Sequence, residues 1–146
     1  MVFQLNGHTD FVRCLTMISG DSFLLLSGSD DHTIRIWDLN SLECIKVINN
    51  AHNGSVKSLI ILPNESIASC SDDMSIRVWN YESGELLIDK QNAHSDEINF
   101  LVNLPNNRFA SGSLDKTIKI WNSSNLDLLH TINLISSTGE SRYNES

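Results

Sequence analysis

The sequence has few cysteines, few prolines and no long hydrophobic run. Its three cysteines, Cys14, Cys44 and Cys70, are too widely spaced for a disulfide framework or a zinc site, which favours ordinary core thiols. No apolar run approaches the roughly 20 residues that span a bilayer. The opening apolar stretch is too short for the core of a signal peptide. These absences predict an intracellular protein, cytoplasmic or nuclear, that has no contact with a membrane.

Positive charge is also scarce. Lysine and arginine number 10 against 18 aspartates and glutamates, so the formal charge of the 146 residues is −8. Proteins that bind the nucleic-acid backbone neutralise phosphates with lysine and arginine, so nucleic acid is an unlikely partner. Apolar residues make up 40% of the chain and charged residues 19%, which is typical of a folded globular domain.

What the sequence does contain is an internal repeat. Its only tryptophans, Trp37, Trp79 and Trp121, are spaced 42 residues apart. The stretches that end at these tryptophans read SGSDDHTIRIW, SCSDDMSIRVW and SGSLDKTIKIW. A histidine precedes each stretch, in Gly7-His8, Ala51-His52 and Ala93-His94. A fixed period of 20–50 residues is typical of solenoids, propellers and other repeat folds.

Each repeat predicts four short strands and no helix, because its apolar runs are short, alternate with polar residues, and are bounded by Gly, Pro, Asn and Asp. The expected strands are residues 12–17, 23–26, 33–37 and 44–48, then 56–62, 66–70, 75–79 and 85–88, and finally 98–104, 108–111, 117–121 and 127–132.

On these residues the chain resembles the WD-repeat family, whose units of 40–45 residues each form a four-stranded propeller blade and carry Gly-His and Trp-Asp signatures. The departures are small: alanine precedes His52 and His94, and asparagine follows Trp79 and Trp121. The resemblance implies an all-β fold with blades at 7–50, 51–92 and 93–135. Residues 1–6 would be the outer strand of a preceding blade, and residues 136–146 a disordered polar tail.

Histidine, serine, aspartate and tryptophan recur together in each unit. The predicted sets are His8, Ser29, Asp31 and Trp37, then His52, Ser71, Asp73 and Trp79, and finally His94, Ser113, Asp115 and Trp121. A catalytic triad needs one exposed nucleophile, a base and an oxyanion hole. A set that occurs three times with tryptophan as fourth member favours a structural role instead. The resemblance implies a buried hydrogen-bonded tetrad in each blade, so we expect no catalysis.

The remaining candidate chemistry is slight. His32 and His130 fall outside the tetrads, and the five histidines form no convergent cluster, so neither a metal nor a cofactor is expected. The paired acids Asp30-Asp31 and Asp72-Asp73 are better explained as turn residues than as acid–base catalysts.

Three blades are fewer than the four to eight with which propellers usually close. Because a blade has two apolar faces that need neighbours, we expect an incomplete, open propeller: a fragment of a longer one, or a chain that self-associates, for instance as two copies in a six-bladed ring.

The resemblance implies a protein-interaction scaffold that binds other proteins or peptides. Its docking surface would be the rim formed by the loops and turns beside the inner strands. These rim positions are Phe11, Arg13, Asp30, Ser55, Lys57, Asp72, Glu97, Asn99 and Leu114. Aromatic residues and arginine are enriched at interfaces, which makes Phe11 and Arg13 the most interface-like pair. The alternative function is a substrate-recognition or regulatory module of a larger enzyme complex, such as a ubiquitin-ligase adaptor.

Overall fold

Twelve antiparallel strands form three sheets of four strands. The computed structural model describes residues 4–18, 20, 23–63 and 65–134. The first sheet contains β1 (Val12–Ile18), β2 (Leu24–Ser29), β3 (Ile34–Asp38) and β4 (Glu43–Ile48). The second contains β5 (Val56–Leu62), β6 (Ser66–Ser71), β7 (Ile76–Asn80) and β8 (Leu86–Lys90). The third contains β9 (Ile98–Leu104), β10 (Arg108–Ser113), β11 (Thr117–Asn122) and β12 (Leu128–Asn133).

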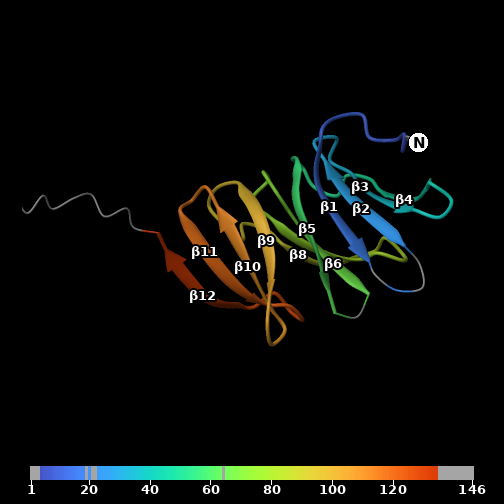
Figure 1. Ribbon diagram of the computed structural model, residues 1–146. Helices are drawn as coiled ribbons and strands as arrows, with labels where there is room; N and C mark the ends of the chain where they lie inside the picture. Colours follow the sequence, from blue (N-terminus) through green and yellow to red (C-terminus); the bar gives the residue numbers. More distant parts are fainter. Residues whose placement is uncertain (1–3, 19, 21–22, 64, 135–146) are drawn as a thin grey trace, which may run out of the picture.

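Each sheet is an up-and-down meander in which consecutive strands pair, and we call the sheets blades 1, 2 and 3. The blades stand side by side (Figure 1), with β1 against β5 and β5 against β9. The predicted all-β fold of three four-stranded blades is confirmed, and the observed strands begin and end within three residues of the predicted ones. The described residues contain no helix and therefore none that could cross a membrane.

The two ends of the chain leave two predictions open. Within the proposed outer strand 1–6, residues 4–6 have an irregular conformation, and residues 1–3 lie outside the described residues. The proposed disordered tail 136–146 and residue 135 of the third predicted blade also lie outside them.

Backbone irregularities recur at the same place in every blade. The pairing of the first two strands shifts at Val12, at Val56 and at Ser113. The residue after the turn aspartate has a left-handed conformation each time, with φ of 66° at His32 and Met74 and 67° at Lys116. Such φ values are uncommon outside glycine, so their repetition shows that the turn geometry belongs to the repeat and not to any one side chain.

Every blade has two faces, because successive side chains of a strand point to opposite sides of the sheet. We call the face that carries the tryptophan the Trp face and the other one the opposite face. Leu59, Ile67 and Trp79 on the Trp face of blade 2 pack against the opposite face of blade 1 in one buried apolar cluster. Leu101, Phe109 and Trp121 of blade 3 pack in the same way against blade 2. The core therefore consists of two layers, each lying between two blades.

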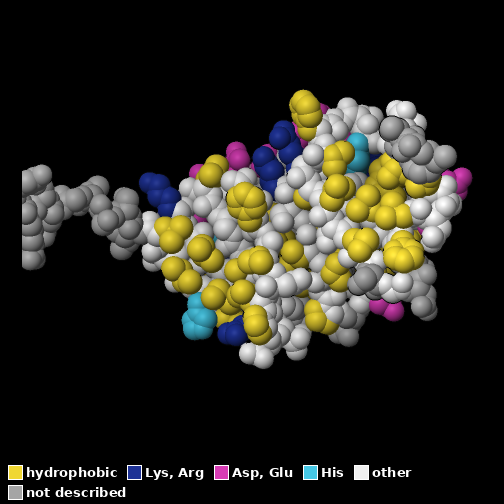
Figure 2. All heavy atoms as spheres, viewed as in Figure 1, with side chains coloured by type: hydrophobic (Ala, Val, Ile, Leu, Met, Phe, Trp, Pro, Cys, Tyr) yellow, Lys and Arg dark blue, Asp and Glu magenta, His cyan; other side chains and the backbone are white. Residues whose placement is uncertain are grey.

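Two faces have no blade against them in this structure. On the Trp face of blade 1, Leu15 is 61% exposed, and on the opposite face of blade 3, Phe100 is 72% exposed. Hydrophobic side chains gather over β1 and β2 at one end of the molecule and over β9 to β12 at the other (Figure 2). The described propeller is thus open, as predicted.

Candidate functional site

A chain of buried hydrogen bonds runs through each blade from the tryptophan to a turn aspartate. In blade 2, Trp79 Nε1 donates to Ser69 Oγ at 2.9 Å, and Ser69 Oγ lies 2.7 Å from His52 Nε2. His52 Nδ1 then lies 3.1 Å from Asp73 Oδ2. Because an ionised carboxylate only accepts, His52 donates from Nδ1, and its Nε2 accepts from the serine hydroxyl. Each polar atom in this chain therefore has a partner.

The same geometry is present in the other two blades. Trp37 Nε1 donates to Ser27 Oγ at 2.8 Å, and His8 bridges Ser27 and Asp31 at 2.6 and 2.8 Å. The third set shows 2.8 Å from Trp121 Nε1 to Ser111 Oγ, 2.7 Å from His94 Nε2 to that oxygen, and 2.8 Å from His94 Nδ1 to Asp115 Oδ2.

The serine of the predicted tetrads is wrong in every blade. Sequence analysis placed Ser29, Ser71 and Ser113 between the histidine and the tryptophan, whereas Ser27, Ser69 and Ser111 occupy that position. In the strand register Trp37 lies opposite Leu25, which makes Ser27 its diagonal neighbour on the same face. Ser29 lies beyond the last pair of that ladder, at Gly28 and Ile34, too far along the strand to reach the indole.

Ser29, Ser71 and Ser113 instead stabilise the turn that contains the aspartate of each blade. The oxygen of Ser29 accepts a hydrogen bond from the backbone amide of Asp31 at 3.1 Å. Ser71 and Ser113 do the same for Asp73 and Asp115, also at 3.1 Å. Sequence analysis also missed a hydroxyl group two positions after each aspartate that donates to its carboxylate. The residues that carry it are Thr33, Ser75 and Thr117.

Their hydrogen-bond partners keep the carboxylates of the three turn aspartates ionised. Burial alone would raise the pKa of Asp31, but hydrogen bonds from Thr33, His8 and the amide of Thr9 outweigh it and hold the pKa well below its usual range. The pKa values of Asp73 and Asp115 are lowered in the same way against the same opposing effect of burial. Burial lowers the pKa of His94 despite its bond to Asp115. This favours a neutral imidazole that donates to a carboxylate.

The tetrads do not present a nucleophile. Ser27, Ser69 and Ser111 are at most 2% exposed, and each accepts from an indole and contacts an imidazole. Within the described ranges, no group of three or more His, Cys, Asp or Glu side chains is arranged to hold a metal ion. The arrangement ties the turn between the second and third strands of each blade to the loop that carries the histidine.

The predicted rim residues lie together at one end of the strands. A backbone hydrogen bond joins the rim positions of each blade: Asp30 N to Phe11 O, Asp72 N to Ser55 O, and Leu114 N to Glu97 O, at 2.9, 3.4 and 3.0 Å. Phe11 is 72% exposed and Leu114 52% exposed. Ser55, Glu97 and Asn99 are half-buried.

Charged pairs organise the rim of blades 1 and 2. Arg13 Nε donates to both carboxylate oxygens of Asp30, at 2.8 and 2.9 Å, and its guanidinium lies 5.4 Å from the centre of the Phe11 ring. Lys57 Nζ lies 3.0 Å from Asp72 Oδ1. The hydrogen bond from Arg13, with a smaller one from Ser55, lowers the pKa of Asp30. Because β1 of blade 1 lies against β5 of blade 2, the rim residues of these two blades lie next to one another.

Comparison with known proteins agrees with this geometry. The sequence model of the family "WD domain, G-beta repeat" matches residues 1–38, 42–80 and 86–122. WD repeat-containing protein 18 from Danio rerio is 47% identical over 57 residues, which are 39% of this chain and 12% of that protein. A probable E3 ubiquitin ligase complex SCF subunit, sconB, from Talaromyces stipitatus is 43% identical over 63 residues, which are 43% of this chain and 9% of that protein.

Among solved structures, the WD40 β-propeller domain of Doa1 superposes with a TM-score of 0.81 at 28% identity. The match covers 89% of this chain and 43% of that one. The chain therefore spans about a tenth of the length of the two curated relatives and less than half of the solved propeller.

Proposed function

This chain belongs to the WD40 repeat family, and on that premise we propose that it is a non-catalytic scaffold that binds other proteins or peptides through its rim. WD40 propellers generally serve as protein-interaction domains, and the tetrads of this chain are engaged in holding its blades. The rim is the surface at which an aromatic side chain, paired charges and backbone turns come together.

The observation that carries the proposal is the arrangement of Phe11, Arg13 and Asp30. Phe11 is largely exposed, yet the guanidinium beside it is held in place by two bonds to Asp30. An exposed aromatic ring beside an ordered arginine is typical of the residues that dominate binding energy in interfaces. Lys57 and Asp72 continue this pattern of paired charges on blade 2.

The two open faces support a second part of the proposal. Leu15 and Met17 on blade 1, and Phe100 and Val102 on blade 3, are all more than half exposed. Exposed apolar patches of this kind mark interaction sites on soluble proteins. We propose that further four-stranded blades cover them, contributed by a longer polypeptide or by a second copy of this chain.

A second candidate function is a substrate-recognition module of a ubiquitin-ligase complex. The observation that favours it is the match to a relative named as an SCF subunit of an E3 ubiquitin ligase complex. That match covers 9% of the relative, so it bears on the repeats and not on the remainder of that protein.

We also propose an intracellular location, which is supported by three free cysteines, since disulfides are typical of oxidising compartments.

Charge reversal tests the rim. The double substitution Arg13→Glu and Lys57→Glu places like charges beside Asp30 and Asp72, which removes both rim pairs. The chain and this variant are each used as bait, and the proteins that co-purify are compared by quantitative mass spectrometry. We expect the specific partners of the wild-type chain to be lost from the variant.

Lys46→Glu is the matched control, because Lys46 lies on β4, away from the rim, and its Nζ donates to Ser83 O. This variant makes one of the same charge changes and should retain the partners. If the rim variant retained them as well, the binding surface would lie elsewhere on the molecule.

A further inference from the structure

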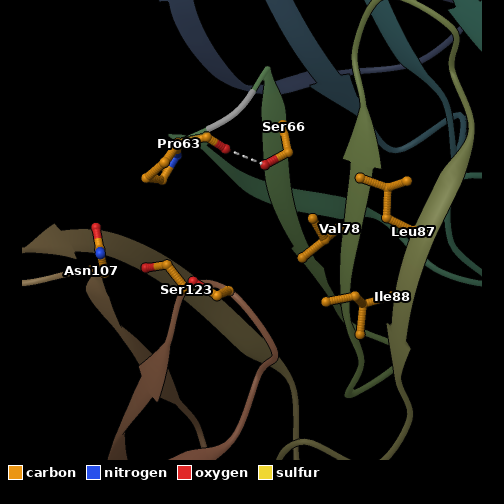
Figure 3. Close-up of a pocket in the computed structure, with 8 residues that line it drawn as sticks. Pro63, Ser66, Val78, Leu87, Ile88, Asn107 and Ser123 are labelled. Atoms are coloured by element: carbon orange, nitrogen blue, oxygen red, sulfur yellow. Dashed lines mark hydrogen bonds between the residues drawn. The ribbon is translucent and has the colours of Figure 1, made fainter.

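A groove opens between blades 2 and 3 at the end of the strands opposite to the rim. It has a volume of about 470 Å³, and we call it the outer groove. Blade 2 contributes Ser66, Val78, Leu87 and Ile88, and blade 3 contributes Ser123 and Ser124. In Figure 3 the side chains of Val78 and Ile88 lie on one side of the open space, and those of Asn107 and Ser123 lie on the other. A volume of this size is in the range of small-ligand sites.

The repeat supplies an internal reference for this groove. Between blades 1 and 2 a smaller cavity of about 280 Å³ is lined by Leu24, Ile36, Ile45, Lys46, Tyr81 and Glu82. Each of these residues stands 42 positions before a residue of the outer groove. The two cavities are therefore the same site in successive repeats.

Two positions change the apolar side chains that pack between the blades, and two more, Lys46 to Ile88 and Glu82 to Ser124, exchange charged side chains for uncharged ones. Tyr81 and Leu24 pack against the apolar cluster between blades 1 and 2. Their counterparts in the outer groove are Ser123 and Ser66, which are far smaller. The backbone is positioned alike, since Tyr81 N donates to Glu65 O and Ser123 N donates to Asn107 O. The outer groove therefore has the walls that hold a tyrosine in the neighbouring repeat, but it lacks the ring.

The walls of the outer groove combine apolar and polar groups in the way a phenol requires. Leu87, which is 49% exposed, and the half-buried Ile88 offer most of the apolar surface, and Val78 lies at the buried base with 3% exposed. The hydroxyls of Ser66, Ser123 and Ser124 and the amide of Asn107 offer hydrogen bonds. The Ser66 hydroxyl already donates to Pro63 O at 2.8 Å, which leaves its lone pairs available to a ligand (Figure 3).

The groove continues beyond the point where a ring would sit. A second hollow shares Pro63, Asn107 and Ser123 with it and is also lined by Asn103, Asn106 and Arg108. Side-chain amides both donate and accept hydrogen bonds, as the backbone of an extended peptide requires. The polar extension is thus suited to the residues that flank an anchored side chain.

We propose that the outer groove binds a tyrosine side chain of an extended peptide segment from a partner protein. The ring would occupy the place that Tyr81 fills between blades 1 and 2. The inference rests on the proposed scaffold function, but it assigns a second surface at the end opposite to the rim.

The test uses N-acetyl-tyrosinamide as the probe and N-acetyl-alaninamide as the comparison, titrated into the 146-residue chain and followed by NMR. We expect saturable shift changes of Val78, Leu87 and Ile88 with the tyrosine probe, and at least tenfold weaker ones with the alanine probe. Shift changes that spread equally over the open blade faces, or none in this groove, would overturn the proposal.

Filling and blocking variants test the same site. Ser123→Tyr supplies the missing ring from within the chain and should weaken the probe at least tenfold, whereas Ser95→Tyr adds a tyrosine at an exposed position outside the groove and should leave binding unchanged. Leu87→Lys places a charge on an exposed wall and gives a second disruptive variant should Ser123→Tyr fail to fold. Unaltered probe binding by both disruptive variants would contradict the assignment.

A final comparison separates this proposal from that of the rim. The rim variant that carries Arg13→Glu and Lys57→Glu should bind the tyrosine probe as the wild-type chain does. Retention of the rim partners by this variant would overturn the rim assignment alone, and failure of the wild-type chain to bind the tyrosine probe would overturn the groove assignment alone.

Discussion

Blade 2 and blade 1 have nearly the same sequence pattern and quite different exposure. Leu15 on β1 and Leu59 on β5 are leucines at equivalent positions of the first strand of their blades. Leu59 is nevertheless 5% exposed and Leu15 is 61% exposed. The difference comes only from the neighbouring sheet, which covers the Trp face of blade 2 and is missing from blade 1. The repeat therefore encodes two apolar faces in every blade, and the position of the blade in the array decides which of them are buried.

The largest expected effect follows from that pair of leucines. Leu59→Ala should lower the free energy of unfolding by about 2–5 kcal/mol, because it removes buried side-chain contacts and leaves a cavity between two blades. Leu15→Ala should change it by less than about 0.5 kcal/mol, as exposed substitutions do. Urea denaturation of both variants checks this. Equal losses would mean that burial between the blades does not stabilise the array.

The next effect concerns the identity of the tetrad serine. Ser69→Ala leaves the Trp79 indole and His52 Nε2 unpaired inside the protein, at a cost of about 1–3 kcal/mol. Ser71→Ala removes a hydrogen bond to the amide of Asp73, for which we expect roughly 0.5–1.5 kcal/mol. Denaturation curves of the two variants decide between the serines. A greater loss for Ser71→Ala would restore the tetrad predicted from the sequence.

Acidification should destabilise the chain in two stages. His94 has a lowered pKa in the folded state, so its contribution is complete above about pH 6.5 and declines as the pH falls below that value. Asp31, Asp73 and Asp115 also have lowered pKa values, and their contribution is lost as the pH falls below about 4. The urea midpoint measured across this range checks both stages. A midpoint that stayed level or rose in acid would contradict the tetrad description.

A smaller effect separates the three aspartates from the surface acids. Asp73→Asn should flatten the acid decline below about pH 4, because one carboxylate with a lowered pKa has been removed. Asp127 serves as the control, since it is exposed near the end of blade 3. Asp127→Asn should leave the slope of the acid decline nearly unchanged. The same pH series, applied to both variants, measures the difference.

The fold was predictable because the repeat carries it. Three tryptophans at a spacing of 42, with short apolar runs between turn residues, were enough to place all twelve strands within three residues. The serine of each tetrad was harder to predict from the sequence. Ser27 and Ser29 are two residues apart and thus point to the same face of β2, so strand alternation could not choose between them. Only the pairing of Leu25 with Trp37 shows which serine is diagonal to the indole.

The outer groove could not be predicted from the sequence for a related reason. The exchange of Tyr81 for Ser123 is visible when the repeats are aligned, but the sequence does not show that both side chains lie at the boundary with a preceding blade. The hydroxyls of Thr33, Ser75 and Thr117 were missed although they recur at the same spacing. Their position after the aspartate was a signal that could have identified them.

Amide hydrogen exchange of the monomeric chain tests most directly whether neighbouring blades protect one another. We predict the slowest exchange in β5, β6 and β7, which have a blade on both sides, and faster exchange in β1 and β12, because protection reflects the local free energy of opening. Equal protection of all three blades would contradict this account.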